Sequence, residues 1–178
     1  MNWEIDDNWT LFLDRDGVIN ERIFGGYVTA PSDFVFRTDF LDVIPGLSEK
    51  FRRIFIVTNQ QGIAKGLMEK RNLLEIHDFM LSEIEKHGGR IDEIFFASNL
   101  KGEHPDRRKP GAVMALEAKE IYPEIDFERS LMIGDTDSDI RFGKNLGMKT
   151  VLLRSEEKIV EKADLEIDSL TELINVLK

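Results

Sequence analysis

Five short apolar runs recur along the chain, separated by longer stretches of mixed polarity. Each run is too short for a helix and is rich in residues that favour strands, so we predict five buried parallel strands. The runs lie at residues 9–13, 54–57, 94–97, 131–133 and 150–153.

Between these runs, hydrophobic residues recur at three- and four-residue steps, the period of an amphipathic helix. The clearest case extends from about residue 69 to residue 87 and ends at Gly88-Gly89. A second helix is predicted to begin at Pro110, because proline suits a first helical turn. Its inward-facing residues are predicted to be Val113, Leu116 and Ile121.

Three shorter helices complete the pattern. One is predicted at 138–145, with Gly147 just past its end, and a weaker one at about 47–52. The last is predicted to start at Ser169, where Ser169-Leu170-Thr171-Glu172 matches a capping box. Strands that alternate with helices give a three-layer, Rossmann-like α/β fold, in which helices cover both faces of a parallel sheet.

The chain is predicted to form one domain over residues 1–178, because this length suffices for one well-buried core and is short for two. Residues 20–42 form the longest predicted irregular segment, and loops of such length tend to be functional. Its aromatic residues are predicted to pack together rather than to bind a ligand. They are Phe24, Tyr27, Phe34, Phe36 and Phe40.

Composition and charge narrow the function classes. The chain is 42% hydrophobic and 33% charged, as in ordinary globular proteins. No stretch approaches the about 20 apolar residues of a membrane span, and the acidic start lacks the features of a secretory signal, so we expect a cytoplasmic protein. We also expect a monomer. The net charge of −10 argues against nucleic-acid and membrane binding, but it permits a small anionic substrate.

The chain has no cysteine, which excludes disulfides, thiolate metal sites and cysteine nucleophiles. Any metal must therefore be held by oxygen or by histidine. The histidines lie far apart and show no ligand spacing, and we expect His77 and His87 to be surface or boundary residues.

Polar groups follow three of the predicted strands, at the edge where parallel sheets bind ligands. A lysine before a proline and a further aspartate add to them. The set comprises Asp14-Arg15-Asp16-Gly17, Thr58-Asn59, Lys109, Gly134-Asp135 and Asp139. Carboxylates, a hydroxyl and a lysine that converge on one crevice describe a magnesium-assisted phosphoryl-transfer site.

In order and spacing, these residues resemble the four motifs of the haloacid dehalogenase (HAD) superfamily, and the resemblance covers nearly the whole chain. It implies an HAD-like sheet with strand order 5-4-1-2-3 and no large cap domain. The first and fourth strands are then neighbours, so Asp14 and Asp135 come together, as a shared cation requires.

The resemblance also implies roles for the acidic residues. Asp14 would attack phosphorus and carry an aspartyl phosphate, while Asp16 would act as general acid and base. A Mg²⁺ ion would be held by the side chains of Asp14 and Asp135 and by the backbone carbonyl of Asp16. Asp139 would be an outer ligand or a partner at a helix start.

The phosphoryl oxygens would be held by a hydroxyl, an ammonium group and backbone amides, which stabilise charge as it shifts during transfer. The resemblance assigns these positions to Thr58, Lys109 and the amides near Arg15 and Asn59.

The residues within these motifs resemble those of the branch that contains heptose-1,7-bisphosphate 7-phosphatases and histidinol-phosphate phosphatases. Within that branch, Gly26-Tyr27-Val28 is closer to the heptose enzymes. This implies that Lys65 and Arg108 contact the sugar or a second phosphate. Arg108 is the better candidate because arginine binds phosphate through two parallel hydrogen bonds. For Lys65, an ordinary surface position is an equal alternative.

One segment departs from that branch, whose members commonly carry a zinc loop just before the Arg-Lys-Pro motif. Residues 98–107 contain no cysteine and a single histidine, His104, so zinc binding is not expected. Polynucleotide 3′-phosphatases share similar wording, although the acidic balance of the chain speaks against them. A catalytically silent binding module on the same fold is the last alternative.

Overall fold

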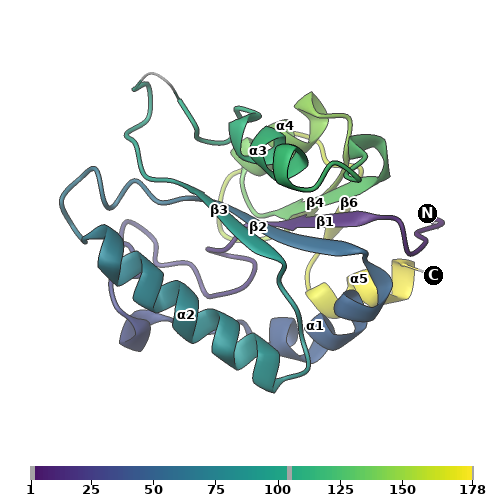
Figure 1. Cartoon of the computed structure of the whole chain (residues 1–178), viewed down its shortest axis with the longest axis horizontal. Coiled ribbons are helices and arrows are strands. Elements are labelled where there is room, and N and C mark those ends of the chain that lie inside the picture. Colours follow the sequence, from purple (N-terminus) through teal and green to yellow (C-terminus); the bar gives the residue numbers. More distant parts are fainter. Residues whose placement is uncertain (1–2, 104–105, 178) are drawn as a thin grey trace.

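The computed structural model describes residues 3–103 and 106–177 and contains a six-stranded parallel sheet (Figure 1). The strands are β1 (Thr10–Leu13), β2 (Arg53–Asn59), β3 (Glu93–Ala97), β4 (Ser130–Gly134), β5 (Lys149–Leu153) and β6 (Leu165–Ile167). Their order is β3-β2-β1-β4-β5-β6. The predicted order is therefore confirmed for the first five strands, and β6 adds an edge strand that was not predicted.

Helices cover both faces of the sheet, as the alternating pattern predicts. Figure 1 shows α1, α2 and α5 on one face and α3 and α4 on the other. Because strand side chains alternate, Leu11 and Leu13 join the core under the first group, and Phe12 joins the core under the second. The helices are η1 (Pro31–Asp33), α1 (Thr38–Lys50), α2 (Lys70–Lys86), α3 (Val113–Ile121), η2 (Phe127–Arg129), α4 (Asp137–Asn145) and α5 (Leu170–Val176).

The first helix is longer than predicted. The weak helix expected at 47–52 is the end of α1, which begins at Thr38, inside the segment predicted to be irregular. Pro45 lies within α1 and hides the pattern, because proline in a helix interior normally signals a break. The buried residues nevertheless follow helical spacing: they are Phe40, Val43, Ile44 and Leu47.

The third helix faces the sheet with residues other than those predicted. It begins at Val113 rather than at Pro110, and Leu116 and Ile121 are 52% and 59% exposed. Met114, Ala115 and Ala118 are buried instead. The face of α3 that meets the sheet thus carries two alanines, whose small side chains allow a helix to pack closely on a sheet.

The aromatic residues of the 20–42 segment divide into two groups. Phe34, Phe36 and Phe40 pack with one another and with α2, as predicted; the ring centroids of Phe34 and Phe36 lie 4.8 Å apart. The prediction is wrong for Phe24 and Tyr27, which line a cavity instead.

Two helix starts are fixed in different ways. At α4, Thr136 and Asp139 form a capping box. At α5, the predicted start after Ser169 is confirmed, but the Ser169 side chain makes no capping bond; the Leu170 amide donates to Asp39 Oδ2 of α1 at 2.8 Å. Among the described helices, none has the length and apolarity to cross a membrane. His104 lies outside the described residues.

Candidate active site

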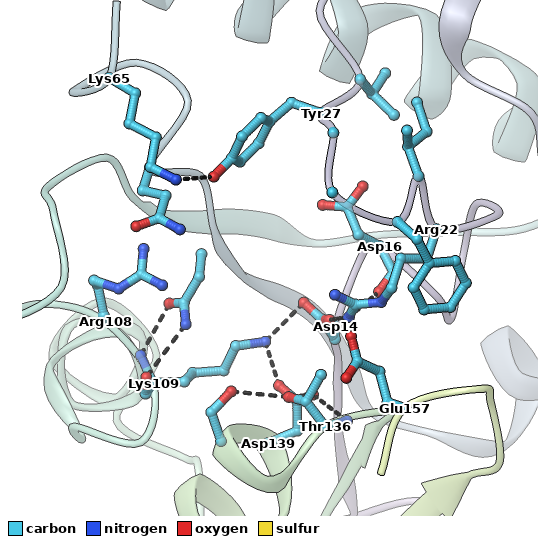
Figure 2. A pocket seen from close by; sticks show the side chains of 18 residues that line it. Asp14, Asp16, Arg22, Tyr27, Lys65, Arg108, Lys109, Thr136, Asp139 and Glu157 are labelled. Atoms are coloured by element: carbon cyan, nitrogen blue, oxygen red, sulfur yellow. Dashed lines mark hydrogen bonds and ion pairs between the residues drawn. The ribbon is translucent and has the colours of Figure 1, made fainter. Parts of the chain in front are cut away.

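A cavity of about 340 Å³ lies where the loops after β1, β2 and β4 meet (Figure 2). Most of the predicted site residues line it: Asp14, Asp16, Asn59, Lys65, Arg108, Lys109 and Asp139. Arg15, Thr58 and Asp135 are buried and lie behind this lining. The structure thus brings most of the predicted site residues together in one cavity.

The pairing of β1 with β4 brings Asp14 and Asp135 together. The Asp14 amide donates to Ile133 O at 2.9 Å, which continues the sheet past the end of β1. Gly17 makes the approach possible, because its φ is +97° and a Cβ atom there would lie 2.1 Å from Asp135 Oδ2. Any other residue at position 17 would strain the turn and push the two loops apart.

Lys109 lies buried between two carboxylates, as Figure 2 shows. Its Nζ is 2.7 Å from Asp14 Oδ1 and 2.6 Å from Asp139 Oδ1, and it donates to Val57 O at 2.5 Å. Burial would lower the pKa of Lys109, but Asp139 and Asp14 outweigh this and raise it. Lys109 therefore brings a fixed positive charge to the floor of the cavity.

The backbone of Lys109 is held by Asn59. Its amide donates to Asn59 Oδ1 at 2.9 Å, and Asn59 Nδ2 donates to its carbonyl at 3.2 Å. These paired bonds tie the end of β2 to the Arg108-Lys109-Pro110 motif. The Asn59 side chain thus positions the lysine.

The carboxylates of Asp14, Asp135 and Asp139 place oxygen atoms within 4.8 Å of one another. Burial raises the pKa of Asp14 to about 6 and that of Asp135 to about 7, with neighbouring carboxylates adding to the effect. The oxygens of Asp139 already have partners, because Oδ2 accepts from the Thr136 amide and hydroxyl at 3.0 and 2.6 Å and Oδ1 faces Lys109. Asp139 thus caps α4 and pairs with the lysine.

Arg22, which was not predicted from the sequence, contacts the acidic cluster formed by Asp14, Asp135 and Asp139. It donates from Nε to Asp135 Oδ2 at 2.8 Å and from Nη2 to Asp135 Oδ1 at 2.6 Å and to the Asp16 carbonyl at 2.8 Å. Its Nη2 also lies 3.8 Å from Asp14 Oδ2. The oxygens predicted to bind a metal therefore accommodate a cation, and they are the hard donors that Mg²⁺ prefers.

The Asp16 carboxylate is fixed by three neighbours. Arg15 Nη2 lies 2.9 and 3.0 Å from its two oxygens, Asn20 Nδ2 donates at 3.0 Å, and Gln60 Nε2 donates at 2.7 Å. Burial would raise the pKa of Asp16, but Arg15 and the hydrogen bonds lower it. Asp16 is thus held ionised.

The Thr58 hydroxyl lies below the cavity surface, where it accepts a hydrogen bond from Gln60 Nε2 at 2.9 Å. Gln60 therefore links the threonine to Asp16. Sequence reasoning gave no role to Asn20 or Gln60, although both adjoin the predicted motifs.

His77 is 4% exposed, so the prediction of a surface or boundary residue is wrong. Its Nε2 lies 3.4 Å from Arg15 Nη1, and burial lowers its pKa to about 3, with the Arg15 charge adding to the effect. A neutral His77 accepts from the guanidinium that orients Asp16. This places α2 in contact with the site through one imidazole.

Cationic side chains also gather at the far end of the cavity. Figure 2 shows Lys65, Tyr27 and Arg108 away from Asp14 and Arg22. Lys65 Nζ donates to Tyr27 Oη at 2.8 Å, and burial lowers the pKa of the half-buried Arg108. The cavity therefore has a positive group near each end.

Known proteins are similar in sequence to this chain over nearly its whole length, which includes all of the site. The D-glycero-alpha-D-manno-heptose-1,7-bisphosphate 7-phosphatase of Campylobacter jejuni is 36% identical over 94% of this chain and 95% of its own. The chain belongs to the HAD-like phosphatases, in the branch of the heptose-1,7-bisphosphate 7-phosphatases. A Helicobacter pylori D-glycero-beta-D-manno-heptose-1,7-bisphosphate 7-phosphatase is 31% identical over 98% of this chain and 99% of its own.

Two further comparisons agree. The HAD-hydrolase-like family model matches residues 106–175. The D,D-heptose 1,7-bisphosphate phosphatase from B. bronchiseptica, solved with magnesium and phosphate, shares the fold with a TM-score of 0.83 at 23% identity, over 94% of this chain and 96% of that one. The predicted superfamily and branch are thus confirmed.

Proposed function

We propose that the protein hydrolyses the 7-phosphate of D-glycero-D-manno-heptose 1,7-bisphosphate with Mg²⁺ as cofactor. The observation that carries this proposal is one cavity with Asp14 and Lys109 at one end and Lys65 and Arg108 at the other. A sugar with a phosphate at each end matches this distribution of charge. The names of the relatives agree with the substrate.

In the proposed reaction, an Asp14 carboxylate oxygen attacks phosphorus, and the bond from phosphorus to the sugar oxygen breaks. The products of this step are an aspartyl phosphate and the sugar alcohol. Water then attacks the aspartyl phosphate, which returns the Asp14 carboxylate and releases inorganic phosphate. Lys109 holds a positive charge 2.7 Å from Asp14 Oδ1, close to the phosphoryl oxygens in both steps.

Asp16 is the proposed general acid and base. Its ionised form, held by Arg15, is the one that accepts a proton from the attacking water. For the first step it must carry a proton to the leaving oxygen, and a phosphate dianion nearby favours this because like charges raise a carboxyl pKa. Without substrate, the surroundings of Asp16 thus keep it ionised, which is the form that acts as a base.

The residues that would hold Mg²⁺ are Asp14 and Asp135 through their side chains and Asp16 through its carbonyl. When bound, the ion reduces the repulsion between the phosphate and the attacking carboxylate. The proposal also includes a monomer of a single domain in the cytoplasm, with no nucleic-acid partner.

Substrate comparison tests the proposal. We expect the highest kcat/KM for heptose 1,7-bisphosphate, assayed as both anomers because the relatives divide between them. Heptose 7-phosphate, histidinol phosphate and a 3′-phosphorylated oligonucleotide should be poorer substrates. A preference for histidinol phosphate or the oligonucleotide would replace the heptose assignment, and no turnover of any of them with Mg²⁺ would favour a silent module.

A pair of adjacent arginines sharpens the test. Arg108→Gln should reduce kcat/KM for the bisphosphate by about tenfold or more, and by less for heptose 7-phosphate, because only the bisphosphate carries a second phosphate. Arg107→Gln is the matched control, since Arg107 pairs with Glu117. Equal losses on both substrates in Arg108→Gln would argue against a second phosphate at this end.

A further inference from the structure

Arg22 and a divalent cation require the same oxygen atoms. The guanidinium group takes both carboxylate oxygens of Asp135 and the carbonyl of Asp16, at distances from 2.6 to 2.8 Å. These are two of the three groups proposed to bind Mg²⁺, and the third, Asp14 Oδ2, lies 3.8 Å away. Two cations on one set of ligand atoms exclude each other by contact and by charge.

Breaking the contact between Arg22 and Asp135 costs free energy unless another cation takes the place of Arg22. Asp135 is fully buried, and a buried carboxylate that loses its cationic partner becomes strongly destabilising. Arg22 is itself only 23% exposed, and its pKa is raised because its hydrogen bonds and charge contacts with Asp135 outweigh burial. Arg22 therefore leaves readily only when another cation takes over its role.

The segment that carries Arg22 can accommodate such an exchange. On one side, the Glu21 amide is tied to Val35 O at 2.8 Å, and on the other, Val28 is buried. Between these anchors lie Ile23 and Phe24, both exposed, and Gly25 with a φ of +71°. A change in the Arg22 rotamer or in this short segment leaves the core intact.

From this arrangement we propose that Arg22 is a built-in competitor for the metal site: it neutralises the acidic cluster until a divalent cation displaces it. The inference rests on the Mg²⁺ ligands of the proposed function. Arg22 thereby sets the Mg²⁺ affinity of the enzyme and keeps the cluster folded at low Mg²⁺ concentration. The segment 22–27 that lines the cavity is in this way coupled to metal binding.

Calorimetric titration of the substrate-free protein with MgCl₂ tests the inference without any measurement of activity. Arg22→Gln keeps a side chain of similar length and removes the competing charge. Its Kd for Mg²⁺ should fall by about tenfold or more relative to the parent, the factor that one charge-assisted contact is worth. An equal or weaker Mg²⁺ affinity in this variant would overturn the inference.

Arg108→Gln is the matched control. It removes one positive charge from the same cavity. Among the described residues, Arg108 forms no hydrogen bond or ion pair with Asp14, Asp135 or Asp139, and its amide donates to Asp106 Oδ1 at 2.9 Å. Its Kd for Mg²⁺ should change by about twofold or less, since distant charges are screened. A gain as large as that of Arg22→Gln would mean that the general field of the cavity, and not direct competition, sets the affinity.

Thermal unfolding supplies the second measurement. In EDTA, Arg22→Gln should lower Tm by several degrees, whereas at saturating Mg²⁺ its Tm should equal that of the parent, because the arginine contacts are then already given up. Equal losses in both conditions would overturn the inference. If Arg22→Gln does not fold without Mg²⁺, the NMR signal of the Arg22 Nε–H group is followed in the parent during the titration. It should shift as the hydrogen bond to Asp135 is lost, and a signal that stays unchanged at saturating Mg²⁺ would overturn the inference.

Failure of the proposed function gives a different result from failure of this inference. A parent protein that binds no Mg²⁺ in the titration lacks the proposed metal site altogether. If the parent binds Mg²⁺ and Arg22→Gln binds it with the same affinity, the proposed metal site stands and only the proposal that Arg22 competes for it is wrong.

Discussion

At the scale of single residues, the site depends on cations that hold its carboxylates in place. Lys109 bridges Asp14 and Asp139, and Arg22 bridges Asp135 and the Asp16 carbonyl. Removing a charged partner from such a buried group is more damaging than removing the same side chain from a surface. Each residue is therefore best tested by a change that keeps its shape.

The nucleophile can be tested in this way. Asp14→Asn keeps the size of the side chain, and Lys109 retains Asp139 as its partner, so the fold should persist. An amide cannot form the aspartyl phosphate, and kcat should fall by about a thousandfold or more. Turnover of an aryl phosphate and the circular dichroism spectrum are the measurements, and turnover near the parent rate would exclude Asp14 as nucleophile.

His77 gives the folded protein a dependence on pH. Its pKa falls from 6.5 when unfolded to about 3 when folded, so its contribution is complete above pH 6.5 and is lost as the pH falls toward 3. Between pH 7 and pH 5 the expected loss from this residue is about 2 kcal/mol of unfolding free energy.

Urea unfolding at the two pH values measures this effect, and His77→Gln is the control, because glutamine offers Arg15 an acceptor but does not titrate. The parent should lose more stability than the variant over this interval. The same loss in both proteins would show that His77 does not carry the effect.

At the scale of elements, the start of α5 depends on another helix. The Leu170 amide donates to Asp39 Oδ2 of α1, and the Ser169 hydroxyl makes no capping bond. Asp39→Ala should therefore destabilise the fold by about 1–2 kcal/mol, since it removes a cap.

Ser169→Ala is the comparison, with a change expected within about 0.5 kcal/mol. Chemical denaturation of both variants decides between a cap supplied by the tertiary structure and the local capping box that the sequence suggests. A larger loss in Ser169→Ala would favour the local box.

At the scale of the whole molecule, α5 closes one face of the sheet. Leu173 of α5 is fully buried in the core that also contains residues of α1, and Trp3 pairs with Leu177 beside it. Leu173→Ala should cost about 2–5 kcal/mol, because it leaves a cavity in this core. The neighbouring Ile174 is 37% exposed, and Ile174→Ala should cost about 1 kcal/mol or less.

Thermal and urea unfolding of this pair measure how much the last helix contributes to the fold. Similar losses in both variants would mean that α5 is not an integral part of the core.

Much of the fold and the center of the site follow from local pattern. Buried strands require apolar runs, and ligand groups follow those strands directly, so Asp14, Thr58 and Asp135 are visible in the sequence. The strand order came from the resemblance to a superfamily, and β6 lay beyond it because a three-residue edge strand has too little pattern. Helix α1 was obscured by Pro45.

The sequence by itself therefore determined the α/β class, the strand ends whose polar residues gather at the cavity and the phosphatase family. Only the tertiary structure decided which neighbours control those groups. Arg22 meets Asp135 across 113 residues, and His77 meets Arg15 across 62. Local periodicity reflects only which face of an element is buried, whereas such pairings depend on how distant loops and helices pack together.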